Sequence, residues 1–588
     1  MNTEVRFLLA IGLMLAVLVG TNLMFPPVIP EEGLVADSLV AGAPPVESVS
    51  GVSGGVVPSG AEASSAIPSI PTQQDPLTVA GQAPVEQAVD GQATGSSVAP
   101  EQRPIVATPL FNFEFSSYGA RLHSAVLTQF DALNREGLVD LMPDGADGYL
   151  GQKLVVGSDT VDLSRVVFDV EPAAGFTLAE GDSARTLRFS YQHPTSPFTF
   201  QIEYEFLPES YQVVVRGSSA GLERPLLVTD LGDGIAFAEA DSAMEARSMA
   251  HVHNHLQEGI QSTIHEKAEP MLVEGPLVWA AFRSKFFVFA LLAGETEVVE
   301  SEASYLGGML VQESQFDGRV RLATAQSLTA GGEFGYRLFM GPQDYALLNS
   351  LGQGMEEVNP YGWKFFRPIV RPFVSVIMKI LTYLHGTLSL GYGWVLIIFG
   401  VMMRVVLFPL NHKAMKAQLR NMAVQPLLKE IQTKYKDQPE KLQKEMMKLY
   451  KEHGFNPLAG CLPMLIPWPV LIALFFVFQN TIELRGVPFL WMPDLSAPDP
   501  LYLLPVFLGL SMFLMQYVSY KSLDAPNPQM KMMMYLMPGM MVFIFFNLAS
   551  GLNLYYATAN IATLPQQIWI ANERKKMKGQ PIPKAKKD

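Results

Sequence analysis

The run Gly391–Leu410, GYGWVLIIFGVMMRVVLFPL, is apolar over the length of a membrane span and contains one charged residue, Arg404. A bilayer core about 30 Å thick needs roughly 20 apolar residues of helix. Arg404 lies six residues before the end of the run, which is roughly 9 Å along a helix that rises about 1.5 Å per residue. An ionised side chain inside the bilayer costs about 2.5–3.5 kcal/mol on insertion scales. The sequence therefore predicts a membrane span whose charge needs a physical explanation.

The composition of the chain indicates a large membrane-embedded part joined to a soluble part. Of its 588 residues, 49% are hydrophobic and only 17% are charged. The formal net charge of −14 hides an asymmetry, because acidic residues concentrate between 100 and 350 and Lys and Arg concentrate after 410. The single cysteine, Cys461, excludes an intrachain disulfide and a cysteine-cluster metal site. It falls in an apolar run, so we interpret it as a buried, inert thiol.

The N-terminal region predicts a membrane anchor followed by a linker. Phe7–Phe25 has nineteen residues without a charge, which is longer than the apolar core of a cleaved signal peptide. We expect residues 1–28 to form a retained signal-anchor transmembrane helix with a cytoplasmic N-terminus. Residues 29–104 are rich in Pro, Gly and Ser and poor in aromatic residues, so they cannot bury a core and are predicted to be a disordered linker.

Residues 105–350 have an alternating pattern that is typical of β-strands. Between Phe198 and Phe206, Phe, Ile and Tyr alternate with Thr, Gln and Glu, as in a half-buried strand. Leu207–Ser210 supplies turn residues, and Tyr211–Val215 returns as a second strand. Because no strong helical pattern interrupts these strands, we predict a large antiparallel β-sandwich.

Three histidines in this region raise the possibility of a metal site. His251, His253 and His255 would share one face of an extended segment, and three imidazoles can bind zinc. No acidic ligand or nucleophile stands at a suitable spacing beside them. We therefore favour an exposed polar strand or loop and predict no metal and no cofactor.

The rest of the chain predicts helices on, across and outside the membrane. In residues 361–386, four cations and Ser375 recur every three or four residues opposite an apolar side, which favours an amphipathic helix in the headgroup plane. A helix packed on the sandwich is the alternative. A second span over 391–411 precedes a charged cytoplasmic helical hairpin over 412–456, broken near Pro439. Four further spans and a basic cytoplasmic tail follow, at 457–482, 501–520, 531–549, 551–570 and 571–588.

The Lys and Arg residues predict the orientation in the membrane. The hairpin holds ten of them and the tail seven, whereas the loop at 483–500 holds only Arg485. We therefore expect the hairpin, the tail and both termini in the cytoplasm, and the sandwich and the 483–500 loop outside. The basic helix at 361–386 opposes this assignment, but a helix that lies flat is a weaker determinant of topology.

Arg404 has no carboxylate partner within the predicted membrane part, because none of the six apolar runs contains an Asp or Glu. Three explanations stay open: snorkelling to nearby headgroups, bonds to water, carbonyls and hydroxyls, or a negative group from another molecule. Polar residues on the later spans favour a wet cavity; they include Gln479, Ser511, Asn553, Tyr555 and Tyr556. A proton relay would need carboxylates or histidines, and no Walker-type glycine loop supplies ATP chemistry.

Several long motifs resemble the YidC/Oxa/Alb family of membrane protein insertases. They are VMMRVVLFPL (401–410), NPLAGCLPMLIPWPVLIAL (456–474), IELRGVPFLWMPDLSAPDP (482–500) and SGLNLYYATAN (550–560), in the family's order. The anchor and the large outside sandwich resemble the Gram-negative type. The resemblance implies five core spans around a hydrophilic groove that opens to cytoplasm and lipid but is closed on the outside. The expected fold is thus a multi-pass α-helical membrane protein with six spans plus an all-β periplasmic sandwich domain.

The resemblance also implies the site residues. Arg404 matches a groove arginine that attracts acidic residues of the incoming chain, and Tyr556 matches a groove tyrosine with Tyr555 beside it. Two departures, Gly400 in place of a frequent threonine and Pro467 in place of a groove glutamine, make these walls of the predicted groove less polar. Gln479 and Ser511 complete the predicted groove, and the expected residues of a hydrophobic slide are Met464, Leu465, Leu471, Met533, Met537 and Met540.

We therefore predict an energy-independent insertase and chaperone of the bacterial inner membrane, without hydrolytic chemistry. Its expected partners are nascent membrane proteins, membrane lipids, the ribosome through the tail and hairpin, and the Sec translocon, with no nucleic-acid function beyond ribosome contact. One alternative is a multi-pass solute transporter or channel with a periplasmic binding domain, although duplicated halves are not evident. Another is a structural anchor for the sandwich. An anchor would need residues 105–330, whereas an insertase tolerates their deletion.

Overall fold

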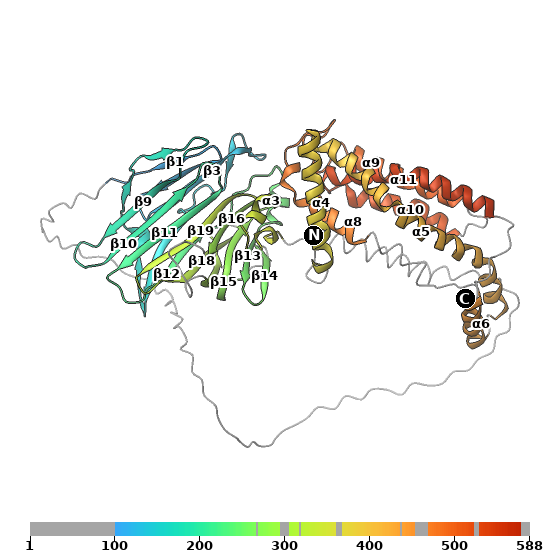
Figure 1. Cartoon of the computed structure of the whole chain (residues 1–588), viewed down its shortest axis with the longest axis horizontal. Coiled ribbons are helices and arrows are strands. Elements are labelled where there is room, and N and C mark those ends of the chain that lie inside the picture. The colour runs from blue at the N-terminus through green and yellow to red at the C-terminus, as the bar shows by residue number, and fades with distance from the viewer. Residues whose placement is uncertain are drawn as a thin grey trace, which may run out of the picture. The chain divides into compact units, whose positions relative to one another are not determined.

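The computed structural model describes residues 100–265, 269–294, 305–316, 319–359, 367–435, 438–452, 468–521 and 528–577. The predicted signal anchor, most of the predicted linker and the tail beyond Met577 lie outside this range. Strands occupy the described chain up to Pro342, and helices occupy most of the chain after that residue (Figure 1). The combination of an all-β region with a helical region confirms the predicted fold class at this level.

Within the described residues, the strands form two sheets that are antiparallel except where β1 pairs with β8. The smaller sheet has the order β4 (Leu138–Asp140), β3 (Arg121–Asp131), β2 (Phe111–Ser116), β1 (Ile105–Ala107) and β8 (Gly175–Thr177). The larger sheet has the order β6 (Asp159–Asp162), β5 (Gly151–Val156), β12 (Leu226–Gly232), β18 (Val320–Ser327), β17 (Leu306–Glu313), β15 (Met271–Arg283), β16 (Phe287–Ala293), β19 (Glu333–Pro342), β11 (Gln212–Ala220), β10 (Thr199–Phe206), β9 (Arg185–Gln192) and β7 (Asp169–Glu171). Beside this path, β13 (Ala250–His255) pairs with β15, and β14 (Gly259–Ile264) pairs with β13. Short helices are η1 (Leu163–Arg165), α2 (Ser242–Ala246), α3 (Tyr345–Ser350), η4 (Met355–Glu357) and η5 (Ile482–Leu484).

The alternating stretch that predicted a strand forms β10, in which every second side chain is buried. It pairs with β11, so that Tyr204 lies opposite Val215. The buried face of β10 packs on aromatic residues of the smaller sheet: the Phe206 ring centroid lies 6.0 Å from that of Phe111 and 6.3 Å from that of Phe113. Fully burying a side chain of this size contributes about 1.5–3 kcal/mol. The buried side chains, which are every second residue of β10, thus pack the two sheets together around one aromatic core.

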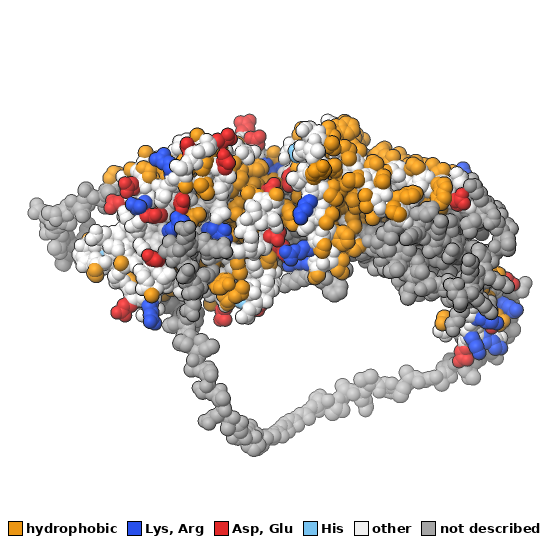
Figure 2. Space-filling model, viewed as in Figure 1, with side chains coloured by type: hydrophobic (Ala, Val, Ile, Leu, Met, Phe, Trp, Pro, Cys, Tyr) orange, Lys and Arg blue, Asp and Glu red, His pale blue; other side chains and the backbone are white. Residues whose placement is uncertain are grey.

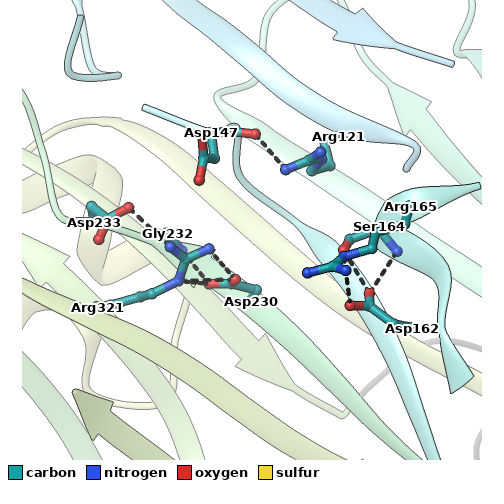
Figure 3. A network of polar contacts seen from close by, with 9 residues as sticks. All are labelled: Arg121, Asp147, Asp162, Ser164, Arg165, Asp230, Gly232, Asp233 and Arg321. Carbon is teal, nitrogen blue, oxygen red and sulfur yellow. Dashed lines mark hydrogen bonds and ion pairs between the residues drawn. The ribbon is translucent and has the colours of Figure 1, made fainter. Parts of the chain in front are cut away.

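Arg321 on β18 holds the end of β12 in place (Figure 3). Its guanidinium forms a two-pronged ion pair with Asp230 (Nη2 to Oδ2, 2.6 Å) and reaches Asp233 at 3.3 Å. Between the two acids the chain turns at Gly232 with a φ of 81°, and a Cβ there would lie 2.4 Å from the Tyr149 ring. Only glycine fits this turn, because L side chains rarely adopt positive φ.

The structure corrects our interpretation of the three histidines as an exposed strand or loop. His251 and His253 are buried, because β13 lies between β14 and β15 rather than at the surface. The ring of His251 lies parallel to that of His265 at the end of β14, with centroids 6.0 Å apart. No group of three His, Cys, Asp or Glu residues suited to a metal ion occurs in the described part of the chain.

Exchange of His265 for glutamine is expected to make the protein less sensitive to acid. Burial lowers the pKa of His265 to about 3 from 6.5. The unfolded chain therefore takes up this proton below pH 6.5 while the folded chain does not, so the histidine contributes stability above pH 6.5 that is lost as the pH falls. At about 1.36 kcal/mol per unit, the loss between pH 7 and pH 5 is about 2 kcal/mol. Urea unfolding of the full-length protein at both pH values measures the difference between parent and variant.

Glu245 acts in the opposite direction and is unchanged in both proteins, so it cancels in that comparison. Burial raises its pKa to about 7 from 4.5. Its folded form binds a proton before the unfolded form does, so its contribution to stability increases as the pH falls from 7 to 4.5. An equal loss of stability in parent and variant between pH 7 and pH 5 would contradict the assignment of the acid-sensitive step to His265.

The helical part consists of α4 (Arg367–Leu388), α5 (Tyr392–Lys434), α6 (Pro439–Glu452), α8 (Trp468–Asn480), α9 (Leu503–Lys521), α10 (Pro528–Phe545) and α11 (Ser550–Met577). Within the described residues, three segments are long and apolar enough to cross a membrane: Arg367–Leu388, Tyr392–Pro409 and Leu503–Lys521. Shorter apolar segments occur in α8 and α10. These helices support a multi-pass membrane protein, whereas the number of six spans stays a prediction.

Two expected boundaries fall inside helices. The helix of the predicted second span continues without a break at 411 into the first arm of the predicted hairpin, because α5 runs on to Lys434. The helix of the predicted last span continues past 570, because α11 runs to Met577. Helix α4, predicted to lie flat, has the length and hydropathy of a span. It runs crosswise to α5, α9 and α11, which lie alongside one another (Figure 1).

Exposed apolar side chains distinguish the surface of the helices from that of the sandwich. Figure 2 shows hydrophobic side chains over the helices and charged side chains scattered over the sandwich. On the helices, Val405, Phe543 and Tyr383 are each more than two-thirds exposed. A helix with an apolar outward face is stable in lipid rather than water.

Candidate functional site

The loop at residues 482–500, which we call the α8–α9 loop, follows α8 and contacts the first residues of α5, α9 and α11. The ring of Phe489 packs against the first turn of α5. The backbone N–H of Ser550, at the start of α11, donates to the carbonyl of Ala497 over 2.7 Å. The buried carboxylate of Asp499 accepts backbone N–H groups at the start of α9. This end of the helices is therefore tied by backbone bonds as well as by packing.

Arg404 lies away from that end, eleven residues beyond Gly393 on α5 and thus roughly 16 Å deeper along the helix. Its side chain is half-buried, and its charge interacts with Tyr555 and Tyr556 of α11. In the described part of the chain, no Asp or Glu forms an ion pair with Arg404. Among the described residues, the positive charge of Arg404 therefore has two tyrosines rather than a paired carboxylate within electrostatic range.

Tyr555 and Tyr556 connect α11 to three other helices. The buried ring of Tyr555 contacts Phe399 of α5 at 5.7 Å and Phe478 of α8 at 5.6 Å between centroids. The hydroxyl of Tyr556 donates to the carbonyl of Leu471 on α8 over 3.5 Å, and its ring meets α10. The structure thus brings together Arg404, both predicted tyrosines and one predicted slide residue, Leu471. Phe399 and Phe478 were missed, since apolar aromatic residues in a span give no signal of a site.

The other predicted groove residues are Ser511 and Gln479. Ser511 is buried on α9, donates to the carbonyl of Leu508 over 2.7 Å and accepts from Asn560 of α11 over 3.1 Å. It therefore fastens two helices together. Gln479 is half-buried, one residue before the end of α8 at Asn480.

The predicted slide is only partly described. Met464 and Leu465 lie outside the described residues, as does Pro467. Met533, Met537 and Met540 are half-buried and recur at spacings of four and three residues, which places them on one face of α10. Flexible thioethers on one face suit contact with apolar segments of varied shape.

Gly400, one turn before Arg404, lets α5 and α11 approach each other closely. A Cβ atom at this position would lie 3.3 Å from Cγ2 of Thr558 and 3.5 Å from Cδ2 of Tyr555. The threonine that the resemblance led us to expect on α5 is absent. A threonine of α11 occupies the adjoining space instead.

Exchange of Gly400 for threonine is expected to lower the stability of the full-length protein by about 1–3 kcal/mol, because added side-chain atoms overpack the contact with Thr558. Exchange for alanine is expected to be close to neutral, since the tight contact is offset by a gain in helix propensity of about 1 kcal/mol. Thermal unfolding in detergent measures both. The loss caused by Gly400→Thr is expected to shrink when Thr558→Ala is also present. An equal loss in both backgrounds would contradict the close approach at this position.

Comparisons with known proteins agree with this architecture. A family model described as "YidC periplasmic domain" matches residues 103–376, and one described as "60Kd inner membrane protein" matches residues 383–578. The membrane protein insertase YidC of Pelodictyon phaeoclathratiforme is 32% identical over 515 residues, which cover 82% of this chain and 84% of the relative. That of Chlorobaculum tepidum is 32% identical over 513 residues, covering 82% and 83%. A solved structure of an active YidC insertase is 18% identical, covers 80% of this chain and 93% of that chain, and has a TM-score of 0.32.

Proposed function

The chain belongs to the YidC family of membrane protein insertases and acts in membrane protein insertion, and on this premise we propose that Arg404 receives the translocating polar segment. The observation that carries the proposal is a half-buried cation beside two tyrosines, without an acid paired to it in the described residues. An arginine stays charged inside a protein, because its guanidinium does not deprotonate there. An acidic group on an incoming chain is the partner that this site lacks.

The groove lowers the free-energy barrier to moving the polar segment across the membrane, because polar groups of the groove replace water around the segment. A polar segment that enters the bilayer loses its hydration, which costs several kilocalories per mole for each unsatisfied group. Arg404, the hydroxyls of Tyr555 and Tyr556 and bound water replace part of that hydration. Gln479 and Ser511 extend the polar lining in this proposal.

The apolar helix of the substrate follows a separate route along the slide. Leu471 on α8 and Met533, Met537 and Met540 on α10 offer it a deformable apolar surface, and we assign Met464 and Leu465 to the same slide. From there the helix partitions into lipid, which favours about 20 apolar residues. Because this partitioning is itself favourable, the insertase needs no hydrolytic chemistry and acts without an energy source of its own.

As a family member, the chain is an inner membrane protein with membrane protein substrates. Its orientation is part of the proposal: both termini in the cytoplasm and the sandwich in the periplasm, as the distribution of Lys and Arg favours. The hairpin at 412–456 and the tail at 571–588 are basic and cytoplasmic in this arrangement, which suits contact with ribosomal RNA. The Sec translocon is a further proposed partner. The alternative of a solute transporter or channel is not favoured by the relatives.

Photocrosslinking tests the groove directly. A photoreactive residue in place of Tyr556 is expected to crosslink stalled nascent chains whose polar segment precedes the first span. The matched control is Leu510, which is 60% exposed on the outside of α9. We expect several-fold more product from position 556. Equal yields at the two positions, or crosslinks from Leu510 alone, would place the substrate outside the groove and contradict the proposal.

A further inference from the structure

A buried ion pair links the α8–α9 loop to the sandwich. Arg485 of the loop pairs with Glu239 of the sandwich, with 2.7 Å between Nε and Oε1, and the two side chains are only 4% and 8% exposed. Nη2 of Arg485 also donates to the carbonyls of Asp131 (2.9 Å) and Ala238 (3.3 Å). The guanidinium lies over the ring of Phe287, 5.2 Å from its centroid. The loop cation is therefore enclosed by sandwich atoms and bonded to three of them.

A second cation crosses the same contact in the opposite direction. Nζ of Lys285, on the sandwich, donates to the carbonyl of Ser496 in the loop over 3.2 Å and lies over the ring of Phe286. The receiving part of the loop is itself held in shape, because the carboxylate of Asp494 accepts the backbone N–H groups of Gly486 and Ser496. The loop and the sandwich thus each supply one cation, Arg485 and Lys285, that bonds to acceptors on the other.

The sandwich side of the contact is rigid. The carboxylate of Glu245 accepts the backbone N–H groups of both Ala238 and Glu239, each over 2.9 Å. These bonds fix the segment that presents the Glu239 side chain. Charged groups in such a buried, hydrogen-bonded network have one favoured arrangement, because any displacement leaves a buried group unsatisfied.

Apolar packing crosses the contact at the adjoining residues. Ile482 belongs to the hydrophobic core of the sandwich, whereas Leu484, two residues later, belongs to the core of the helices. The short helix η5 holds both residues. Movement of the loop away from the helix ends would therefore pull Leu484 out of their core, and movement away from the sandwich would pull Ile482 out of its core.

We propose that Arg485 is a positioning residue through which the sandwich holds the α8–α9 loop down over the helix ends, keeping that end of the groove closed. The inference rests on the proposed groove around Arg404 and identifies the α8–α9 loop, held by the sandwich, as the element that closes it. The same loop binds the start of α9 and of α11, so a loop held by the sandwich fixes those helices as well. A polar segment in the groove then has its route outward controlled by the loop rather than by an open channel.

Accessibility of a cysteine beneath the loop tests the proposal. Ala549 is 5% exposed and forms a backbone bridge with Pro498 of the loop. In full-length protein with Cys461→Ser, Ala549→Cys is labelled in spheroplasts with a membrane-impermeant maleimide. Adding Glu239→Ala is expected to raise the labelling rate about tenfold or more, since loss of one partner of a buried pair shifts an equilibrium by more than one power of ten.

Two further variants separate positioning from stability. Lys285→Met removes the donor to Ser496 but leaves the pair of Arg485 and Glu239 in place, and is expected to raise labelling by a smaller factor. Arg371→Ala is the matched control, because this cation of α4 also pairs with sandwich acids, Glu356 and Glu357, but is 56% exposed. We expect it to change labelling less than about twofold. Unchanged labelling in folded Glu239→Ala protein would overturn the proposal and leave the pair a stabilising contact alone.

A control cysteine distinguishes this failure from a failure of the proposed orientation. Pro493 is exposed in the loop, so Pro493→Cys is expected to be labelled in spheroplasts whether or not Glu239 is present. If it is labelled only in inverted vesicles, the proposed orientation is wrong. Labelling of Ala549→Cys with and without Glu239→Ala is then compared in those vesicles. Faster labelling with Glu239→Ala supports the proposal, and unchanged labelling overturns it.

Discussion

Exchange of Arg404 for alanine is expected to reduce the insertion of substrates with an acidic translocated segment by about tenfold or more. Two opposite unit charges 4 Å apart interact with about 4 kcal/mol at an effective dielectric constant near 20. If only half of this is gained in the rate-limiting step, the rate changes about 30-fold. Protease protection of a small single-spanning substrate, in cells depleted of their native insertase, measures the effect.

The chemistry of the substrate supplies the control for this variant. When the acidic residues of the segment are replaced by Asn and Gln, the difference between parent and Arg404→Ala is expected to shrink. Arg404→Lys keeps the charge and is expected to retain most of the activity. Unchanged insertion of the acidic substrate by Arg404→Ala would remove the charge-attraction step from the mechanism but would leave insertion itself in place.

Exchange of Glu239 for alanine is expected to destabilise the full-length protein by about 3–5 kcal/mol, because it leaves a buried guanidinium without its counter-ion. Arg485→Ala is expected to cost less. Burial raises the pKa of Glu239 and the Arg485 charge opposes that rise, so without Arg485 the carboxyl can take up a proton and become neutral. The arginine cannot become neutral in the same way, since it does not deprotonate in proteins.

Thermal or urea unfolding in detergent measures this asymmetry. Glu239→Gln keeps an oxygen that accepts from Nε of Arg485 and is expected to fall between the parent and Glu239→Ala. Arg371→Ala again serves as the exposed control, with an expected change below about 1 kcal/mol. A larger loss for Arg485→Ala than for Glu239→Ala would show that the Arg485 contacts to carbonyls and Phe287 dominate over the charge pair.

Local periodicity predicted the division into an all-β region and a region of apolar helices. Alternation between Phe198 and Phe206 predicted a strand because half-burial in a sheet repeats every two residues, and β10 has that pattern of burial. The apolar run around Arg404 predicted a span-length helix, which forms the first part of α5. Helix ends were predicted less well: charged residues become frequent after 411, but this change in composition does not end the helix, and α5 continues to Lys434.

Contacts between residues far apart in the sequence could not be predicted from local sequence patterns. His251 and His253 look like an exposed polar strand, and only the pairing of β13 with β14 and β15 shows that they are buried. Arg485 stood out as the one cation of its loop, yet no local pattern connects it with Glu239. At the candidate site, the motif resemblance brought Arg404 and Tyr556 together, whereas Ser511 proved to bond to Asn560.

The ion pair between Glu239 and Arg485 also has a consequence for synthesis of the chain. The two residues are 246 positions apart, and ribosomes add about 5–20 residues per second, so the acid is made roughly 10–50 s before its cation. Until then Glu239 lacks this counter-ion, and the sandwich core lacks Ile482. The sandwich therefore completes its fold only after the helix that precedes the α8–α9 loop has been made, and maturation of the earlier domain depends on the arrival of the later one.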